Sequence, residues 1–272
     1  MKAWKGVFQM PVRGRMSKPR TRGVTMVLDK GLGLHTTEDL MAVGADYIDY
    51  LKLSFGTSAL YDKELTRQKA ALVTGAGVSI YPGGTFLEIA VAQGTYDQYL
   101  ARAGDLGFNA IEVSDGTIDM SLALREDVIK RALDQGFTVV SEVGKKDPNE
   151  KIATDLMLRQ IAADLALGVS KVIVEARESG RGVGIYDRSG AVDGGELDLI
   201  LAGVDDVDDL MWEAPIKSQQ LYMINRFGVN VSLGNVAATD VLAVEALRVG
   251  LRGDTLKPAL QDGSIFAALG AR

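Results

Sequence analysis

One pattern repeats along the chain from Gly23 onward: short apolar runs rich in β-branched residues alternate with longer amphipathic stretches, eight of each. Stretches such as Ser121 to Leu133 and Asn149 to Leu167 space their apolar residues by three and four, as helices lying against a sheet do. The apolar runs lie near Val24 to Asp29, Tyr47 to Leu53, Val78 to Tyr81, Ala110 to Val113, Thr138 to Val143, Lys171 to Ala176, Leu210 to Glu213 and Val229 to Leu233. This alternation predicts repeated βα units around a parallel sheet.

Eight such units in about 250 residues predict a single (β/α)8 TIM barrel, which we expect over residues 24–255. An open dinucleotide-binding sheet is the alternative, but neither Gly31-Leu32-Gly33 nor Gly182-Val183-Gly184 has the full spacing of that motif. Residues 1–23 hold seven basic residues and no acid, and residues 256–272 follow the barrel as a C-terminal extension. The basic segment is interpreted as a solvated arm that wraps the body, with an anion-attracting or subunit-contacting arm as the alternative.

The composition excludes several kinds of chemistry. Without cysteine the chain has no disulfide, thiolate nucleophile, zinc finger or iron–sulfur cluster, and His35 is its single histidine. We interpret His35 as a hydrogen-bonding residue at a helix start and not as a catalyst. A net charge of −6 disfavours nucleic acid and anionic membranes as partners. With neither an apolar run of about 18 residues nor a signal-like start, a cytoplasmic location is expected.

Charged residues follow many of the predicted strands, at the end of a barrel where active sites are built. Glu142, Glu175 and Glu213 end three neighbouring strands and share their inward faces with apolar residues, so the three carboxylates should converge. Their repulsion requires a cation or protons, and an all-oxygen ligand set selects a hard ion, so we predict Mg²⁺. The alternative is a solvated ring of salt bridges with Lys52, Lys145, Lys146 and Arg177.

Other segments suggest anion binding. The segments Gly83-Gly84-Thr85 and Leu233-Gly234-Asn235 are predicted to open helices and to offer backbone N–H groups. The segment Leu247 to Thr255 contains two arginines and two glycines, which suits phosphate or carboxylate, although a surface turn is an equal alternative. The candidate substrate-binding residues are thus Asp29, Arg177, Gly83, Gly84, Thr85, Gly234, Asn235 and Arg252.

Nine segments, taken in order, resemble the phosphosulfolactate synthase family over about Lys18 to Thr255. They are KPRTRGVTMVLDKG, KLSFGTS, YPGGT, IEVSDG, SEVGKK, VIVEARESG, MWEAP, LGNV and LRVGLRGDT. One departure is Phe55, where many members have tryptophan. The resemblance implies a Mg²⁺-dependent enzyme that adds sulfite to C3 of phosphoenolpyruvate. Its product, (2R)-3-phosphosulfolactate, belongs to one route to coenzyme M.

The implied reaction suits this chain, because sulfite is a strong nucleophile that needs no thiol or histidine to activate it. Bound Mg²⁺ would stabilise charge developing on the substrate carboxylate, and a strand-end lysine would protonate C2. Lys145 is favoured as this acid over Lys146, with Lys52 as a further candidate, while Arg177 and Arg252 would hold phosphate or sulfite. Two alternatives stay open: a Schiff-base aldolase using Lys52 or Lys145, and a non-catalytic stress-related homologue. The basic arm and the resemblance suggest a homo-oligomer, such as a trimer.

Overall fold

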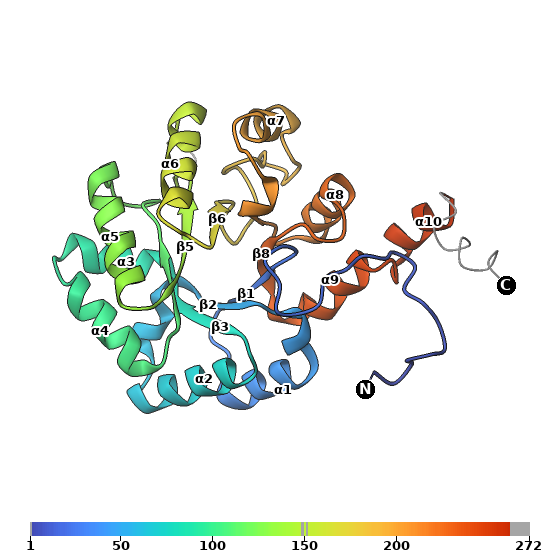
Figure 1. The fold of residues 1–272 in the computed structure, drawn as a ribbon, viewed down its shortest axis with the longest axis horizontal. Coiled ribbons are helices and arrows are strands. Elements are labelled where there is room, and N and C mark those ends of the chain that lie inside the picture. The colour runs from blue at the N-terminus through green and yellow to red at the C-terminus, as the bar shows by residue number, and fades with distance from the viewer. Residues whose placement is uncertain (1, 148–149, 151, 262–272) are drawn as a thin grey trace.

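The computed structural model describes residues 2–147, 150 and 152–261, and its eight strands are all parallel. Their hydrogen-bonded order is β3-β2-β1-β8-β7-β6-β5-β4, with the helices packed outside (Figure 1). The strands are β1 (Thr25–Asp29), β2 (Tyr50–Leu53), β3 (Ser79–Pro82), β4 (Ala110–Val113), β5 (Thr138–Val143), β6 (Lys171–Val174), β7 (Leu210–Glu213) and β8 (Leu233–Ala237). This confirms the predicted (β/α)8 barrel.

The barrel closes between β3 and β4, which lie at the two ends of the hydrogen-bonded order. Asn109, the residue before β4, accepts a hydrogen bond from Ile80 N at its Oδ1 (2.9 Å) and donates its own N–H to Ile80 O (3.4 Å). Inside the barrel a small apolar core is built from one inward residue of most strands, including Met26, Val140 and Ile173. This core fills the barrel interior below the carboxyl ends of the strands. Inward-facing polar side chains can therefore gather at those carboxyl ends.

Ten α-helices surround the strands in the described part of the chain, and a larger apolar core lies between them and the sheet. None of them is long and apolar enough to span a membrane. The helices are α1 (Leu34–Gly44), α2 (Lys63–Gly75), α3 (Gly84–Ala92), α4 (Tyr96–Leu106), α5 (Leu122–Asp134), α6 (Thr154–Ala166), α7 (Gly194–Ala202), α8 (Lys217–Phe227), α9 (Val241–Arg248) and α10 (Gly253–Gln261).

Several predicted boundaries are wrong. The eighth strand runs over Leu233–Ala237 and not over 229–233, because the carbonyls of Val229 and Val231 bond to Arg248 instead of to a neighbouring strand. The helix expected from residue 149 begins at Thr154; residues 148, 149 and 151 lie outside the described residues. A barrel end at residue 255 would fall inside α10, and residues 262–272 of the predicted extension also lie outside the described residues.

Several basic residues in the second half of the arm are bound to the barrel and are not solvated. Arg15 Nε lies 3.0 Å from Glu245 Oε1, and Arg20, whose side chain is 1% exposed, places its Nε 2.9 Å from Asp49 Oδ1. Lys18 Nζ donates to three backbone carbonyls at the start of the barrel. The arm therefore uses its positive charges to close the amino-terminal end of the barrel. Its first residues differ, since Trp4 is 69% exposed.

Candidate active site

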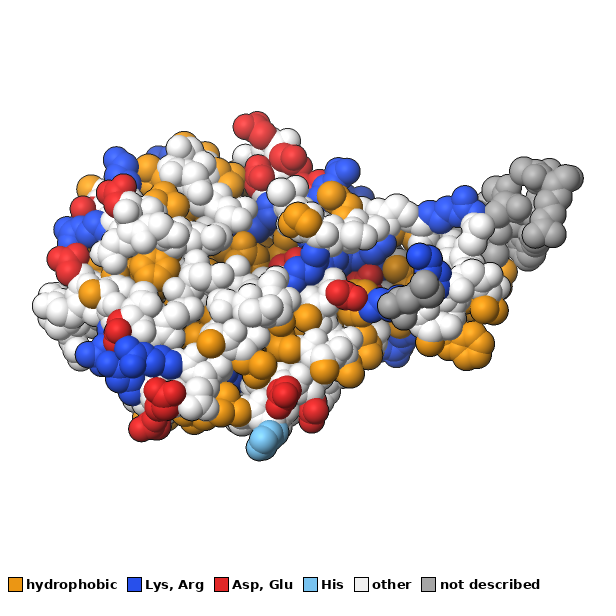
Figure 2. Space-filling model, turned by 60° about the horizontal axis from the view of Figure 1, so that its bottom comes forward, with side chains coloured by type: hydrophobic (Ala, Val, Ile, Leu, Met, Phe, Trp, Pro, Cys, Tyr) orange, Lys and Arg blue, Asp and Glu red, His pale blue; other side chains and the backbone are white. Residues whose placement is uncertain are grey.

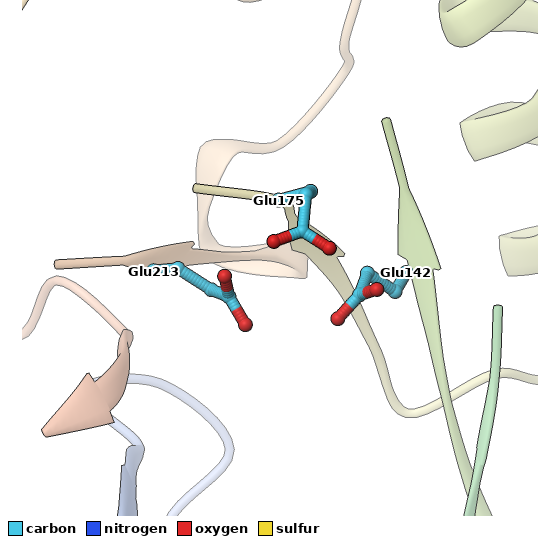
Figure 3. A group of neighbouring side chains, drawn as sticks. All are labelled: Glu142, Glu175 and Glu213. Atoms are coloured by element: carbon cyan, nitrogen blue, oxygen red, sulfur yellow. The ribbon is translucent and has the colours of Figure 1, made fainter. Parts of the chain in front are cut away.

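Three buried glutamates meet at the carboxyl ends of β5, β6 and β7. Each of Glu142, Glu175 and Glu213 offers a carboxylate oxygen, and these atoms all lie within 4.8 Å of one another. Figure 3 shows the three side chains, from neighbouring strands, pointing toward one another. They follow Val140, Ile173 and Met211 of the inner core on the same strand faces, so period-two alternation places them directly above that core. The structure brings the three together, as the sequence predicted.

A fourth carboxylate, Glu112 of β4, belongs to the same cluster and was not singled out from the sequence. Lys52 Nζ lies between these carboxylates, at 2.9 Å from Glu112 Oε2, 3.1 Å from Glu142 Oε2 and 3.6 Å from Glu213 Oε1. Glu112 follows the inner-core residue Ala110 by two positions. The alternation that found the other glutamates could therefore have found this one.

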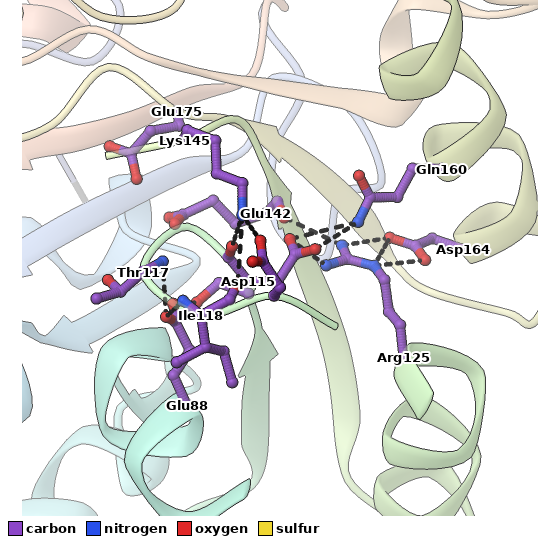
Figure 4. A network of polar contacts seen from close by, with 12 residues as sticks. Glu88, Asp115, Thr117, Ile118, Arg125, Glu142, Lys145, Gln160, Asp164 and Glu175 are labelled. Carbon is purple, nitrogen blue, oxygen red and sulfur yellow. Dashed lines mark hydrogen bonds and ion pairs between the residues drawn. The ribbon is translucent and has the colours of Figure 1, made fainter. Parts of the chain in front are cut away.

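The structure reverses the preference for Lys145 over Lys146. Lys146 Nζ lies 2.9 Å from Glu142 Oε1 and 3.5 Å from Glu175 Oε2. Lys145 turns the other way, toward the loop after β4, where it is paired with Asp119 and donates to backbone carbonyls (Figure 4). The expectation that adjacent side chains point to opposite sides holds, and Lys146, four residues after Glu142, lies on the same side as Glu142, as alternation along an extended segment places it.

The cluster is buried, and its charges are strongly coupled. Burial raises the pKa of Glu112 to about 7, although Lys52 opposes the shift. Burial, together with the charges of Glu142 and Glu213, also raises the pKa of Glu175 well above its ordinary value. For Glu142, burial is outweighed by Lys146 and Lys52, which hold its pKa below the ordinary range. Of the predicted ring, Lys52 and Lys146 do pair with the glutamates, but these pairs are buried and not solvated, and Lys145 pairs with Asp119 instead.

A further buried acid, Glu88, holds the loop after β4 in place. Glu88 of α3 is 1% exposed and accepts hydrogen bonds from Ser114 Oγ and from the N–H groups of Thr117 and Ile118, which fixes the loop after β4. Its Oε1 also lies 3.6 Å from Lys146 Nζ. Because Glu88 lies in the middle of a helix and not at a strand end, strand-end reasoning could not reveal it.

Arg125 of α5 locks the backbone beneath Glu142. Its Nη2 donates to Glu142 O (3.0 Å), and Nε and Nη2 both donate hydrogen bonds to the carboxylate of Asp164. Nη1 donates to Asp115 Oδ1 (3.0 Å), so this single buried guanidinium ties α5, α6 and the loop after β4 together (Figure 4). A network of charge-assisted bonds of this kind preorganises the residues it supports.

A cavity of about 200 Å³ opens above the cluster, and Lys52, Lys146, Glu112, Glu175 and Glu213 all contribute to its wall. Three non-glycine residues have a positive φ in the described part of the chain: Phe55 (56°), Arg177 (60°) and Asn235 (52°). All three line this cavity. Such backbone strain concentrates at functional sites, so these residues support the assignment of this cavity as the active site.

Arg177 occupies a position suited to an anionic substrate. Arg177 is exposed at the rim, and its backbone carbonyl accepts a hydrogen bond from Asn235 Nδ2 (3.3 Å). Asn235 Oδ1 is buried and has no hydrogen-bond partner among the residues described. The segment Leu233-Gly234-Asn235 belongs to β8 and does not open a helix, which corrects the prediction. Gly234 instead leaves room for Met26, whose Cε would lie 3.0 Å from a Cβ at that position.

The segment Gly83-Gly84-Thr85 does open a helix, α3, as predicted, but two of its N–H groups are already used. Gly83 donates to Leu53 O (2.8 Å) and Gly84 to Glu112 Oε1 (2.8 Å). Among these three residues, Thr85 is left to face a ligand. A Cβ on Gly84 would collide with Ser114 Oγ and with Glu112 Oε1, so glycine is required where α3 passes β4.

Asp29, Arg252 and His35 do not line the cavity. Asp29 is fully buried, is paired with Lys69 and accepts hydrogen bonds from the N–H groups of Gly31 and Leu32. Arg252 lies in the turn between α9 and α10, with its Nε 3.9 Å from Asp254 Oδ2. The side chain of His35 is fully exposed at the start of α1, and Figure 2 shows it projecting from the surface. Asp29 thus has a buried structural position away from the cavity, and the Nδ1 of His35 lies 3.9 Å from Glu38 Oε2.

Buried carboxylates and lysines around a cavity at the strand ends of a (β/α)8 barrel define a TIM-barrel enzyme. Residues 13–254 match the family model described as (2R)-phospho-3-sulfolactate synthase (ComA). The chain belongs to this family of enzymes, whose product is phosphosulfolactate.

Relatives at high identity agree with the family assignment. The phosphosulfolactate synthase of Methanocaldococcus jannaschii is 45% identical over 86% of this chain and 94% of its own length. The enzyme of the same name from Bacillus subtilis is 36% identical over 91% of this chain and 98% of its own. Among solved structures, the YdjI aldolase of Escherichia coli K12 aligns with a TM-score of 0.52 at 11% identity, covering 90% of this chain and 92% of that one. At that identity the likeness shows the fold alone.

Proposed function

We propose that this protein catalyses the Mg²⁺-dependent addition of sulfite to C3 of phosphoenolpyruvate, giving (2R)-phospho-3-sulfolactate, with Lys146 as the proton donor to C2. The observation that supports this most is the position of Lys146 Nζ, which faces the cavity within 3.5 Å of two of the three converging glutamates. The relatives named above support the product, and the site geometry supports the roles of the residues.

The residues present fit a hard divalent cation. Glu142, Glu175 and Glu213 supply only carboxylate oxygens, and Glu175 Oε2 accepts no hydrogen bond from the described residues. Oxygen ligands without histidine or cysteine are those that Mg²⁺ prefers. When bound, Mg²⁺ supplies Lewis-acid stabilisation of the negative charge that develops on the substrate carboxylate. Lys52 and Lys146 offset the remaining charge of the cluster.

The residues around the cavity can bind and orient the substrates. Arg177 at the rim, the N–H of Thr85 and the start of α3 provide positive potential for phosphate or sulfite. In the reaction the sulfite sulfur forms a bond to C3, the C2–C3 π electrons move toward the carboxylate, and Lys146 gives its proton to C2. Lys146 is fixed on one side of the cavity by Glu142 and Glu175, so protonation occurs on one face.

The Schiff-base alternative is disfavoured by the surroundings of Lys52. An imine forms only from a neutral amine, which burial alone would favour at Lys52. Three carboxylates within 3.6 Å of its Nζ outweigh burial and raise its pKa well above the ordinary value. Lys52 is therefore assigned to holding Glu112, Glu142 and Glu213 in place.

The direct test is to incubate the purified protein with phosphoenolpyruvate, sulfite and Mg²⁺ and to follow phosphosulfolactate by mass spectrometry. We expect product only when both substrates are present, and none when sulfate, which has no nucleophilic lone pair on sulfur, replaces sulfite. If phosphoenolpyruvate and sulfite were both left unconsumed by folded protein, the non-catalytic alternative would be favoured.

A further inference from the structure

We propose that the amino-terminal end of the barrel holds a second binding site, for a small organic carboxylate with an apolar body, centred on Arg248. Arg248 is the last residue of α9, and it lies against the segment that leads into β8. The active-site cavity lies at the opposite ends of the strands, and none of its lining residues belongs to the cavity beside Arg248.

The guanidinium of Arg248 is buried, with one edge bonded and the other free. Nη1 donates to Val229 O (2.8 Å) and to Val231 O (2.6 Å), while the residue as a whole is 0% exposed. Nε and Nη2 have no hydrogen-bond partner in the described part of the chain. These two nitrogens lie on the same edge of the group, and their parallel N–H bonds match the two oxygens of a carboxylate.

Other buried arginines of this chain show how that edge is normally satisfied. Arg125 uses Nε and Nη2 together on Asp164, at 3.0 Å and 2.6 Å. Arg20 places Nε on Asp49, and Arg15 places Nε on Glu245, although the Nη2 of Arg15 has no partner among the described residues. Arg248 differs from all three because no carboxylate of the described residues reaches its Nε–Nη2 edge.

The charges around Arg248 also favour the binding of an anion. Glu245, one turn earlier on α9, is held by Arg15, so it does not bind the free edge. Burial and the charge of Arg15 lower the pKa of Arg248 to about 9. A buried cation without its counter-charge is destabilising, and a bound carboxylate would supply that counter-charge together with two hydrogen bonds.

The cavity beside Arg248 determines the size and polarity of the part of the ligand beyond its carboxylate. Its volume is about 330 Å³, and its walls are mostly apolar, with Val12 of the arm, Ile224 of α8, Leu247 of α9 and Pro258 of α10. Asn225 lies at an exposed position of the same wall. An apolar pocket with one buried guanidinium suits a carboxylate with a small aliphatic body better than inorganic phosphate, which needs polar contacts on every side.

Isobutyrate is a suitable probe, and thermal unfolding of the full chain measures its binding by linkage. The melting temperature of the wild-type protein should rise with isobutyrate, compared with chloride at equal ionic strength. Two variants should weaken the apparent affinity about tenfold or more. Arg248→Lys keeps a donor for the carbonyls of Val229 and Val231 but removes the Nε–Nη2 edge of the guanidinium. Asn225→Trp narrows the opening of the cavity beside Arg248 from an exposed position. Tyr222→Trp, on the same helix but outside this cavity, is the matched control and should respond like the wild type.

The inference is wrong if the wild type shows no specific response to isobutyrate. It is equally wrong if Asn225→Trp responds like the wild type, which would locate binding elsewhere, for example in the active site. A response to inorganic phosphate with none to isobutyrate would contradict the proposed ligand class. Should Arg248→Lys fail to fold, Asn225→Trp and its Tyr222→Trp control decide the question alone.

Discussion

Replacing Lys146 with alanine should lower turnover by about 10² to 10⁴ while changing substrate binding much less. Lys146 Nζ faces the active-site cavity and is the proposed source of the C2 proton, so its loss removes an interaction used in the transition state. Steady-state kinetics with phosphoenolpyruvate and sulfite separate kcat from KM.

Lys145→Ala is the matched control, because it removes the same charge one residue away. Lys145 contacts Asp119 and backbone carbonyls of the loop after β4, so its removal should cost turnover less than tenfold. If Lys146→Ala kept wild-type turnover, water or another residue would have to donate the proton. If Lys145→Ala lost as much as Lys146→Ala, the assignment of the acid to Lys146 would fail.

Removing divalent cations should abolish turnover, and adding Mg²⁺ should restore it. Glu142, Glu175 and Glu213 present three buried carboxylates within 4.8 Å, and the proposed cation offsets their repulsion while stabilising charge on the substrate. The measurement is activity after treatment with a chelator, followed by titration with Mg²⁺. Full turnover in excess chelator would contradict the role of the metal.

A substitution identifies the ligands. Glu175→Gln keeps the shape of the side chain but removes its charge, and it should raise the Mg²⁺ concentration needed for half-maximal activity by about 10- to 100-fold or more. Glu126→Gln, at an exposed position of α5, is the control and should leave this concentration unchanged. An unchanged requirement in Glu175→Gln would exclude Glu175 as a ligand.

The sequence predicted the barrel and most of the acidic cluster because both depend on simple periodicities. Alternation along a strand places Glu142 and Glu213 on the inward face, and the ends of parallel strands meet at one end of a barrel. Glu112 obeys the same rule and was available to the same reasoning.

Other features depend on geometry that no periodicity encodes. Arg252 was misplaced because its segment follows α9, and a helix in a βα unit returns the chain to the end away from the active site. The contact of Glu88 with the loop after β4 requires the packing of α3 to be known.

The most direct test of the account is the reaction run in D₂O with the wild-type enzyme, with product analysed by NMR and chiral separation. Proton delivery from a lysine held on one side of the cavity predicts one deuterium at C2 and a single enantiomer, (2R)-phospho-3-sulfolactate. A racemic product, with deuterium delivered to both faces of C2, would show that solvent and not a fixed side chain protonates the intermediate. That result would contradict the proposed mechanism.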